Sequence, residues 1–277
     1  MLWQNAAVPE LPEVETTRRG LEPHLVGRRI ETLILRRKDL RWPIPGHLPR
    51  TVLGQPILAV RRRAKYLLID TAPGSLLLHL GMSGRLRLVS PETPAGRHDH
   101  YDLALEPPQV LRFTDPRRFG CLLWQPAGQT HPRLRDLGPE PLDAGFKGAI
   151  LFAASRGRTA PAKALLLDQT AVAGLGNIYV AEALFAAGIR PTRPARRLTR
   201  ADCDALADAI RRILRRAVAR GGTTLRDFLR PDGAPGYFEQ ELLVYGRAGE
   251  PCRVCGAPVR ELVQSGRSSC YCPRCQA

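Results

Sequence analysis

The chain has 277 residues, with 42 lysines and arginines against 26 aspartates and glutamates, a net charge of +16 and an isoelectric point near 10.4. This length accommodates two domains with cores of their own, and the charge favours a polyanionic partner such as nucleic acid over a solvated basic surface of no specific meaning. Residues 1–8 lack the features of a secretory signal and no stretch is apolar enough to span a membrane, so we expect a cytoplasmic protein.

Residues 9–15, which read PELPEVE, are the first distinctive segment of the chain. A helix is predicted from Pro12 to about His24, because proline suits the first helical turn and the neighbouring glutamates complement the positive end of the helix. Gly27 follows soon after and is expected to end it.

The chemistry of Pro9 depends on whether a residue precedes it. A proline at a free amino terminus is a secondary amine, which can attack an aldehyde carbon and form an iminium. Behind Val8, as the sequence is written, the same nitrogen belongs to a tertiary amide and is not a nucleophile.

Short β-rich runs separated by glycine and proline extend from Arg29 to about Gln125. Several such strands close together suggest a sandwich or a barrel. The clearest runs are Tyr66-Leu67-Leu68-Ile69, Leu76-Leu77-Leu78, Arg85-Leu86-Arg87-Leu88 and Val110-Leu111-Arg112-Phe113. Residues 126–148 follow without a clear period, are rich in proline and glycine, and are predicted to be an interdomain linker.

Helical periodicity replaces the β pattern after the linker. Thr199 and Asp202 form a capping signature, which predicts a helix that begins next to Thr199. Apolar residues then follow at core-facing spacing: Leu206, Ile210, Ile213, Leu214 and Ala217. We therefore expect an amino-terminal β domain and a carboxyl-terminal helical domain on either side of a cleft.

Four cysteines near the carboxyl end have the spacing of a zinc site. Cys252 and Cys255 form one CxxC pair, and Cys272 and Cys275 form a second after sixteen intervening residues. Four thiolates complete a tetrahedral zinc sphere and leave no open position for catalysis, so the expected cofactor is one structural Zn²⁺. The alternative is four cysteines unrelated to metal.

The other cysteines have the wrong spacing to join this site. Cys270 adjoins the second pair, and Cys121 and Cys203 are interpreted as ordinary small apolar residues. Between the two pairs, residues 265–268 read SGRS and predict a hairpin tip that presents Arg267. Its guanidinium suits a phosphate, although a solvated arginine is an equal alternative.

Six segments, in order and nearly without gaps from Pro9 to Gln276, resemble the formamidopyrimidine-DNA glycosylases of bacterial base-excision repair. Any one of them alone is a moderate signal, but together they are very specific. They are residues 9–15, Arg63-Ala64-Lys65-Tyr66-Leu67-Leu68, His79-Leu80-Gly81-Met82-Ser83-Gly84, Asp115-Pro116-Arg117-Arg118-Phe119-Gly120, Gly174-Leu175-Gly176-Asn177-Ile178-Tyr179, and the ending Tyr271-Cys272-Pro273-Arg274-Cys275-Gln276.

The resemblance implies an α+β multidomain fold. Its parts are a catalytic β-sandwich with an amino-terminal helix, a helix-two-turn-helix DNA-binding domain and a four-cysteine zinc finger. The implied boundaries are residues 9–125 for the sandwich, 126–148 for the linker, 149–245 for the helical domain with a lesion-recognition loop at 221–238, and 246–277 for the finger.

The resemblance also implies an enzyme that excises oxidised purines, chiefly 8-oxoguanine and formamidopyrimidines, from double-stranded DNA and then cleaves the abasic strand. The related endonuclease VIII branch, which acts on oxidised pyrimidines, usually has glycine where this chain has Leu11. Leu11 and the segment Gly221-Gly222-Thr223-Thr224-Leu225 favour the purine-specific branch. We expect such an enzyme to act as a monomer.

Four catalytic roles follow from the resemblance. Pro9 is the nucleophile if it is the first residue, and Glu10 moves protons during ring opening and base departure. A carboxylate that only stabilises the helix start is the alternative for Glu10, but that description suits Glu13 or Glu15 better. Lys65 assists β-elimination and Arg267 assists δ-elimination; Lys65 is one of only four lysines, and lysine can release a proton where arginine cannot.

DNA contacts follow from the resemblance as well. A damaged base must leave the duplex to be reached, so the gap must be filled, and Met82, Arg117 and Phe119 are implied to fill it. Periodicity alone would place Met82 and Phe119 in a core. The implied DNA contacts further include His98, Arg158 and Asn177, whereas His79 is equally well a buried structural histidine and Lys163 is a weak candidate.

The extension of residues 1–8 departs from the family pattern, because it blocks the nitrogen of Pro9 and would occupy the lesion pocket. Val8 is what a GTG start codon reads as when translated internally. We therefore expect initiation there, followed by removal of methionine, to leave Pro9 as the first residue of the working protein. The alternatives are processing by another protease and a non-catalytic paralogue that only binds damaged DNA.

Overall fold

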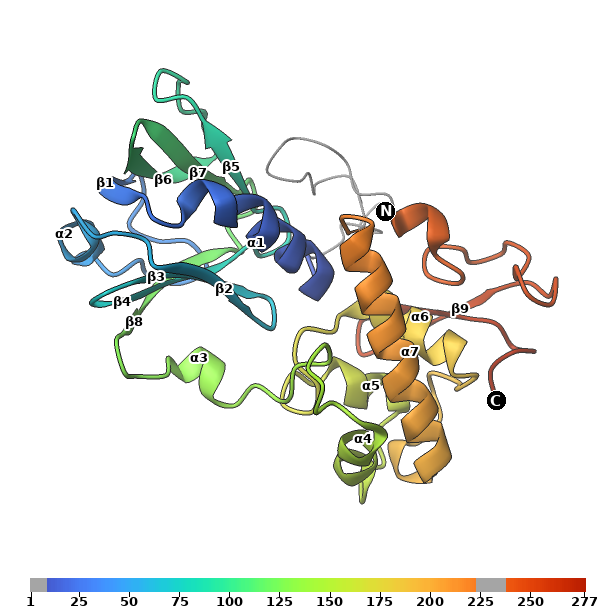
Figure 1. Ribbon diagram of the computed structural model, residues 1–277. Helices are drawn as coiled ribbons and strands as arrows, with labels where there is room; N and C mark the ends of the chain where they lie inside the picture. The colour runs from blue at the N-terminus through green and yellow to red at the C-terminus, as the bar shows by residue number, and fades with distance from the viewer. Residues whose placement is uncertain (1–8, 223–237) are drawn as a thin grey trace. The chain divides into compact units, whose positions relative to one another are not determined.

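The computed structural model describes residues 9–222 and 238–277 (Figure 1). The extension of residues 1–8 and most of the expected lesion-recognition loop, residues 223–237, lie outside this description. The described residues form two compact units. The first contains residues 9–135 with Gly221 and Gly222, and the second contains residues 136–220 and 238–277.

Helix α1 (Leu11–Leu25) opens the first unit and agrees with the predicted helix to within one residue at each end. Glu10 is its N-cap and forms a capping box with Glu13, whose carboxylate accepts the Glu10 N–H at 3.0 Å. This reciprocal pair satisfies two N–H groups that a helix start leaves without partners. Gly27 follows the helix with a φ of +83°, a conformation that favours glycine.

Two four-stranded antiparallel sheets make up the rest of the first unit, which confirms the predicted sandwich. One sheet has the order β1-β6-β7-β5 and the other the order β2-β3-β4-β8. The strands are β1 (Arg29–Leu35), β2 (Ala59–Arg63), β3 (Tyr66–Thr71), β4 (Gly74–His79), β5 (Arg85–Val89), β6 (Asp99–Glu106), β7 (Gln109–Thr114) and β8 (Cys121–Pro126), with the short helices α2 (Leu48–Val52) and α3 (Pro132–Arg135).

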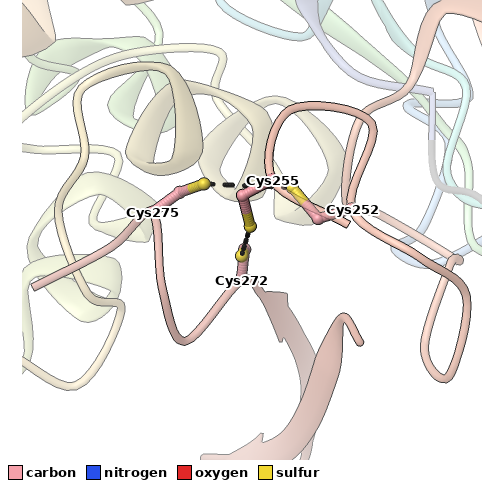
Figure 2. A group of neighbouring side chains, drawn as sticks. All are labelled: Cys252, Cys255, Cys272 and Cys275. Carbon is pink, nitrogen blue, oxygen red and sulfur yellow. Dashed lines mark hydrogen bonds between the residues drawn. The ribbon is translucent and has the colours of Figure 1, made fainter. Parts of the chain in front are cut away.

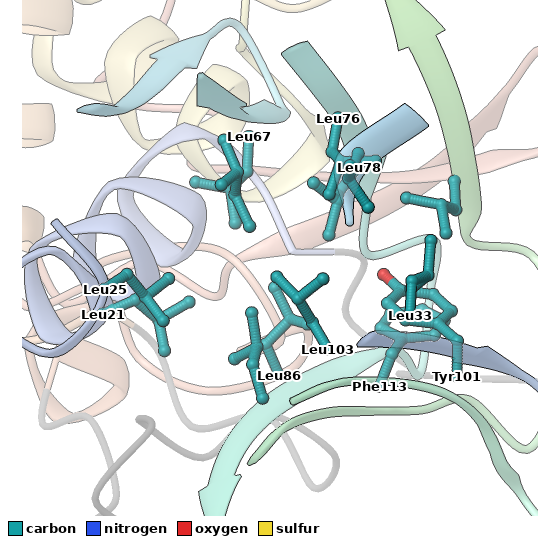
Figure 3. Close-up of a cluster of buried hydrophobic side chains, with 14 of the residues drawn as sticks. Leu21, Leu25, Leu33, Leu67, Leu76, Leu78, Leu86, Tyr101, Leu103 and Phe113 are labelled. Atoms are coloured by element: carbon teal, nitrogen blue, oxygen red, sulfur yellow. The ribbon is translucent and has the colours of Figure 1, made fainter. Parts of the chain in front are cut away.

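One hydrophobic core joins the two sheets and α1. Side chains of α1, of β3 and β4, and of β1, β5, β6 and β7 converge in it, as Figure 3 shows. Tyr101 and Phe113 stack within this cluster with their ring centroids 4.9 Å apart, and each is at most 2% exposed. Burial on both inner faces is what holds a sandwich of short strands together.

Helices make up most of the second unit. They are α4 (Gly148–Ser155), α5 (Ala162–Leu167), α6 (Asn177–Ala186) and α7 (Arg200–Ala219), with the 3-10 turns η1 (Ala195–Arg197) and η2 (Phe238–Glu241). Helix α7 packs against α4 and α6, and α6 packs against α5. A Cβ added to Gly148 would lie 2.5 Å from the Asp204 backbone, so the close approach of α4 to α7 requires glycine there.

The predicted start of α7 is confirmed. Thr199 is the N-cap, and its side chain and that of Asp202 form the capping box that their spacing indicates. The apolar residues predicted to face the core are buried, except Ile213, which is half-buried. No helix among the described residues is both long and apolar enough to cross a membrane.

The carboxyl-terminal module of the second unit is attached to α6. Its two strands, β9 (Arg260–Gln264) and β10 (Arg267–Tyr271), pair as an antiparallel hairpin, and β10 contacts α6. The segment before the hairpin is held by Glu182 of α6, a carboxylate 3% exposed, which accepts the backbone N–H groups of Leu243, Val244 and Tyr245 at 2.9 Å each.

Candidate functional site

The start of α1 carries the expected nucleophile and its neighbour. Pro9 and Glu10 are both buried, and Glu10 is 2% exposed. Glu10 therefore shares with Glu13 the stabilisation of the helix start, a role that the sequence assigned to Glu13 or Glu15. Glu15 binds arginines instead: burial opposes its ionisation, but hydrogen bonds from Arg18 and Arg19 outweigh it and lower the pKa of Glu15.

Lys65 lies at the tip of the hairpin between β2 and β3, and β2 packs against α1. The turn consists of Ala64 and Lys65, and Ala64 has a φ of +52°, which is unusual for a residue other than glycine. Glu15 of α1 accepts a hydrogen bond from Arg62 of β2 at 3.1 Å, so the hairpin is tied to the helix that begins next to Pro9. Strain held by such contacts is typical of functional turns.

His79, at the end of β4, is a neutral histidine close to Lys65. Burial, together with the positive charges of Lys65 and Arg41, lowers its pKa to about 4. Its Nδ1 accepts the N–H of Gly81 at 2.9 Å, which places the ring proton on Nε2. His79 therefore stabilises the turn after β4 through Nδ1, and its Nε2–H is a hydrogen-bond donor.

The low pKa of His79 predicts a loss of stability in mild acid. Its unfolded form binds a proton below about pH 6.5, whereas the folded form stays neutral down to about pH 4, so stability is lost as the pH falls through this window. Between pH 7 and 4.5 we expect wild type to lose about 2 kcal/mol more than the His79→Gln variant, whose side chain does not titrate. Urea unfolding at both pH values measures the difference, and equal losses would contradict the assignment.

Three residues expected to fill the gap left by a flipped base come together in the first unit. Met82 lies in the turn after β4, and Arg117 and Phe119 lie in the turn between β7 and β8. Phe119 is 44% exposed, which removes the core alternative for it, and Met82 is half-buried. The Arg117 guanidinium lies 5.0 Å from the centroid of the Phe119 ring.

His98, an expected DNA contact, is hydrogen-bonded to the start of the turn between β7 and β8. It is half-buried and precedes β6 directly. Its carbonyl oxygen accepts the N–H of Asp115 at 2.9 Å, and Asp115 begins the turn that carries Arg117. A backbone hydrogen bond therefore joins His98 to the turn that carries Arg117 and Phe119.

In the second unit, Asn177 and Arg267 lie on elements that are joined through Ser268. Asn177 is the first residue of α6, and its Nδ2 donates to the Ser268 carbonyl at 3.0 Å. Arg267 is exposed and begins β10 after a turn in which Ser265 has a φ of +49° and Gly266 a φ of +72°. The predicted hairpin tip is thus present, and it displays Arg267 one residue before Ser268, whose carbonyl binds Asn177.

Lys163 binds the same hairpin from α5. It is 2% exposed, and its Nζ donates to the Ser268 carbonyl at 2.5 Å and to the Ser269 hydroxyl at 2.6 Å. Together with Arg267, Gln264 and Ser265 it lines a cavity of about 340 Å³ beside α5. Arg158, another expected DNA contact, is half-buried and donates to Asp168 at 2.7 Å.

The four cysteines predicted to bind zinc form one cluster, as Figure 2 shows. All four Sγ atoms lie within 4.8 Å of one another; Cys252 and Cys275 are 3.9 Å apart, and Cys255 and Cys272 are 3.4 Å apart. A tetrahedral ion with Zn–S bonds of about 2.3 Å separates its sulfur ligands by about 3.8 Å. The donor set and its spacing therefore fit one zinc ion.

The remaining cysteines are apolar packing residues. Cys121 and Cys203 are fully buried, as predicted, and burial raises the pKa of the Cys121 thiol to about 12. Cys270 is 4% exposed and packs in an apolar cluster with Phe185, Val244 and other side chains. None of these three belongs to the zinc-binding group among the described residues.

Sequence reasoning missed the residues that hold the candidate site residues in place. They are Asp115, Ser83, Lys163 and Glu182, buried polar side chains that each have at least one partner far away in the sequence. Asp115 begins the segment DPRRFG, which resembles the family, but nothing in the neighbouring sequence indicated which groups its carboxylate binds. The family resemblance made Lys163 a weak candidate near the flipped base, and nothing local indicated that it binds the hairpin.

Three family models together match most of the chain. Residues 8–122 match the formamidopyrimidine-DNA glycosylase N-terminal domain, and residues 137–229 match the formamidopyrimidine-DNA glycosylase H2TH domain. Residues 249–277 match the zinc finger found in FPG and IleRS.

Curated relatives and solved structures agree with these matches. The formamidopyrimidine-DNA glycosylase of a Stenotrophomonas maltophilia strain is 61% identical over 97% of this chain and 100% of its own length, and that of a Pseudomonas aeruginosa strain is 56% identical with the same coverage. The crystal structure of MutM (Fpg) from Thermus thermophilus has a TM-score of 0.87 at 43% identity, covering 97% of this chain and 98% of its own. Wild-type Lactococcus lactis Fpg in complex with N7-benzyl-Fapy-dG DNA has a TM-score of 0.90 at 36% identity, covering 97% and 99%.

Proposed function

The chain belongs to the formamidopyrimidine-DNA glycosylase family, and we propose that Pro9 is its nucleophile, Glu10 its proton shuttle, and Lys65 and Arg267 the residues that assist strand cleavage. The protein is a base-excision repair enzyme that removes oxidised purines from DNA and acts as a lyase on the abasic strand. The observation that carries this function is the similarity to glycosylases over their full length, at 61% identity.

The chemistry of the proposed nucleophile begins with a free amine. An α-amino group with a pKa of about 8 is partly neutral at cellular pH, so its lone pair is available without strong activation. As the nitrogen of Pro9 bonds to the sugar C1′, the C1′–base bond breaks and the base leaves with a proton. The C1′–O4′ bond then breaks, O4′ takes up a proton, and the bond between C1′ and the nitrogen becomes an iminium, which makes the C2′ proton acidic.

Strand cleavage follows by two eliminations. Loss of the C2′ proton expels the phosphate on the 3′ side, and a second proton loss expels the phosphate on the 5′ side. We assign assistance of the first step to Lys65 and of the second to Arg267. Supporting observations are the tie between the Lys65 hairpin and α1, and the exposed position of Arg267 on a braced hairpin tip. The burial of Glu10 directly after Pro9 supports its assignment as the proton shuttle.

DNA is the partner of this family, as the complexes of the Lactococcus lactis relative with lesion-containing DNA illustrate. We assign Met82, Arg117 and Phe119 to the gap in the duplex, and His98, Arg158 and Asn177 to further DNA contacts. Arg158 would exchange its half-exposed ion pair with Asp168 for a phosphate. The zinc ion is structural, since the four cysteines fill its coordination sphere.

We also propose the oligomeric state of the protein, the form of its DNA substrate and its location in the cell. The protein acts as a monomer on double-stranded DNA with oxidised purines, in the cytoplasm at the bacterial nucleoid and away from membranes. The relatives named above are bacterial, and the net charge of +16 suits a DNA partner.

Lesion preference tests the proposed function. With the chain that begins at Pro9, we expect excision of 8-oxoguanine opposite cytosine to exceed excision of thymine glycol by at least about tenfold, since a pocket built to hydrogen-bond one base rejects a base without those groups. Gel separation of the cleaved strands measures both rates. Preference for thymine glycol would instead establish the endonuclease VIII-like alternative, and absence of excision from either duplex would favour a damage-binding paralogue.

A further inference from the structure

Asp115 lies at the junction of the two turns that carry Met82, Arg117 and Phe119. Its side chain is fully buried at 0% exposure. One carboxylate oxygen, Oδ1, accepts the Ser83 hydroxyl at 2.6 Å and the Arg117 N–H at 3.2 Å. The other, Oδ2, accepts the Gly120 N–H at 2.8 Å.

The bonds of this carboxylate reach both turns. Ser83 follows Met82 directly, whereas Arg117 and Gly120 are 34 and 37 residues further along the chain and flank Phe119. The Ser83 hydroxyl oxygen also accepts the Arg117 N–H, at 3.2 Å. A single carboxylate thus determines the spacing between Met82 on one turn and the Arg117–Phe119 pair on the other.

The backbone of Asp115 adds the neighbouring segment. Its N–H donates to the His98 carbonyl at 2.9 Å, and its carbonyl accepts from His100 Nε2 at 2.7 Å. His98 is one of the expected DNA contacts. Three segments that are separate in the sequence therefore meet at one residue.

The two turns also pack backbone to backbone at Gly81, so the contacts of Asp115 join segments that already lie close together. A Cβ added to Gly81 would lie 2.4 Å from the Gly120 nitrogen and 2.4 Å from the Phe119 carbonyl carbon. Arg118, between the two presented side chains, has a φ of +57°. That conformation is unfavourable for a residue with a Cβ, so surrounding contacts must hold it.

We propose that Asp115 is the positioning residue that fixes Met82, Arg117 and Phe119 as one rigid wedge for insertion into the duplex. This inference rests on the proposed function, in which those three side chains fill the space of the flipped base. Unstacking a base step costs a few kcal/mol, and a wedge that is already ordered adds no loop-ordering cost to it. Asp115 itself does not touch the DNA in this account.

Insertion can be measured without catalysis. The probe is a duplex with a tetrahydrofuran abasic analogue and 2-aminopurine beside the widowed base, whose fluorescence rises when a wedge unstacks it. We expect wild type to raise the fluorescence, Asp115→Ala to abolish most of the rise at saturating protein, and Asp115→Asn and Ser83→Ala to give intermediate values. Asparagine keeps one acceptor but places an NH₂ group against an N–H or hydroxyl donor.

A catalytic comparison separates positioning from general stability. For Asp115→Ala we expect kcat/KM for 8-oxoguanine opposite cytosine to fall on the order of 10²-fold, since displacement by about 1 Å has effects of that size. Cleavage of a single-stranded abasic oligonucleotide, which needs no wedge, should fall less than about threefold. If Asp115 only stabilised the fold, cleavage of the single-stranded oligonucleotide would fall as much as excision from the duplex.

Asp102→Asn is the matched control. Asp102 is also a buried carboxylate, 3% exposed, and lies in β6 beside the strand that Asp115 follows, but its side chain binds Arg36 and Arg112 and neither turn. We expect this variant to lose stability while keeping the wild-type fluorescence rise and the wild-type ratio of the two cleavage rates.

The outcomes are distinguishable. A wild-type protein that inserts its wedge but neither excises nor cleaves would overturn the proposed function and leave the positioning role supported. A normal fluorescence rise with Asp115→Asn and Ser83→Ala, or an equal loss on both substrates with Asp115→Ala, would overturn the inference. If Asp115→Ala does not fold, as judged by its thermal transition, the other two variants decide the matter.

Discussion

A chain that begins at Pro9 should be trapped on an 8-oxoguanine duplex by borohydride, whereas the chain that begins at Met1 should give no crosslink. Borohydride reduces only an iminium, and the nitrogen of Pro9 can form one only if no peptide bond precedes it. Removing a catalytic nucleophile has effects of about 10⁴-fold or more, so the difference should be close to all-or-none.

A chain that begins at Val8 is the matched control, because it blocks Pro9 with a single residue and adds little bulk. We expect it to behave like the chain from Met1. Equal crosslinking by all three forms would mean that another amine attacks the sugar, and Lys65 would then be the first to test. The intact mass of the protein from its own cells shows independently whether the working chain starts at Pro9.

Replacing Cys255 by alanine should remove the zinc ion and most of the enzymatic activity. Zinc binding supplies on the order of 10 kcal/mol to the folding of small four-ligand modules, and a two-stranded hairpin alone is only marginally stable. The β9–β10 hairpin carries Arg267, so its loss should lower strand cleavage by about 10²-fold or more. Metal content by atomic emission and cleavage of an abasic duplex measure both effects.

Cys270→Ala is the matched control for this change. Cys270 lies in the same module and is buried, but it is not one of the four clustered thiols. The variant should keep one zinc ion per chain and strand cleavage within about threefold of wild type, with a small loss of stability from the cavity. Full zinc content in Cys255→Ala would show that the four cysteines do not act as one site.

Features that depend on neighbours in the sequence could be predicted. The first helix followed from a proline with adjacent acids, the start of α7 followed from Thr199 and Asp202, and the hairpin tip followed from Ser265 and Gly266. The zinc cluster followed from the spacing of two CxxC pairs. In each case the deciding interaction spans only a few residues or repeats a fixed ligand spacing, so the physical cause is contained in a short piece of chain.

Local patterns indicated a β domain followed by a helical domain, and the family resemblance added the activity, which no local pattern would have determined. Met82 and Phe119 illustrate this, because their periodicity alone would have placed them in a core. The exposure of Phe119 and the contact of its ring with the Arg117 guanidinium could be established only from the structure.

The buried polar groups that hold the candidate site residues could be identified only from the three-dimensional contacts. Lys163 binds the hairpin 105 residues away through Ser268, and the Asp115 carboxylate joins Ser83 to Gly120. Such partners cannot be deduced from sequence, because a carboxylate or an ammonium can bind any complementary group that the fold brings within about 3 Å. The four metal ligands and the positive charge could thus be read from the residues alone, and the family resemblance is the ground for proposing Pro9 as the nucleophile. The fold decided which of its charged side chains support that chemistry from within, because burial requires each of them to have a partner.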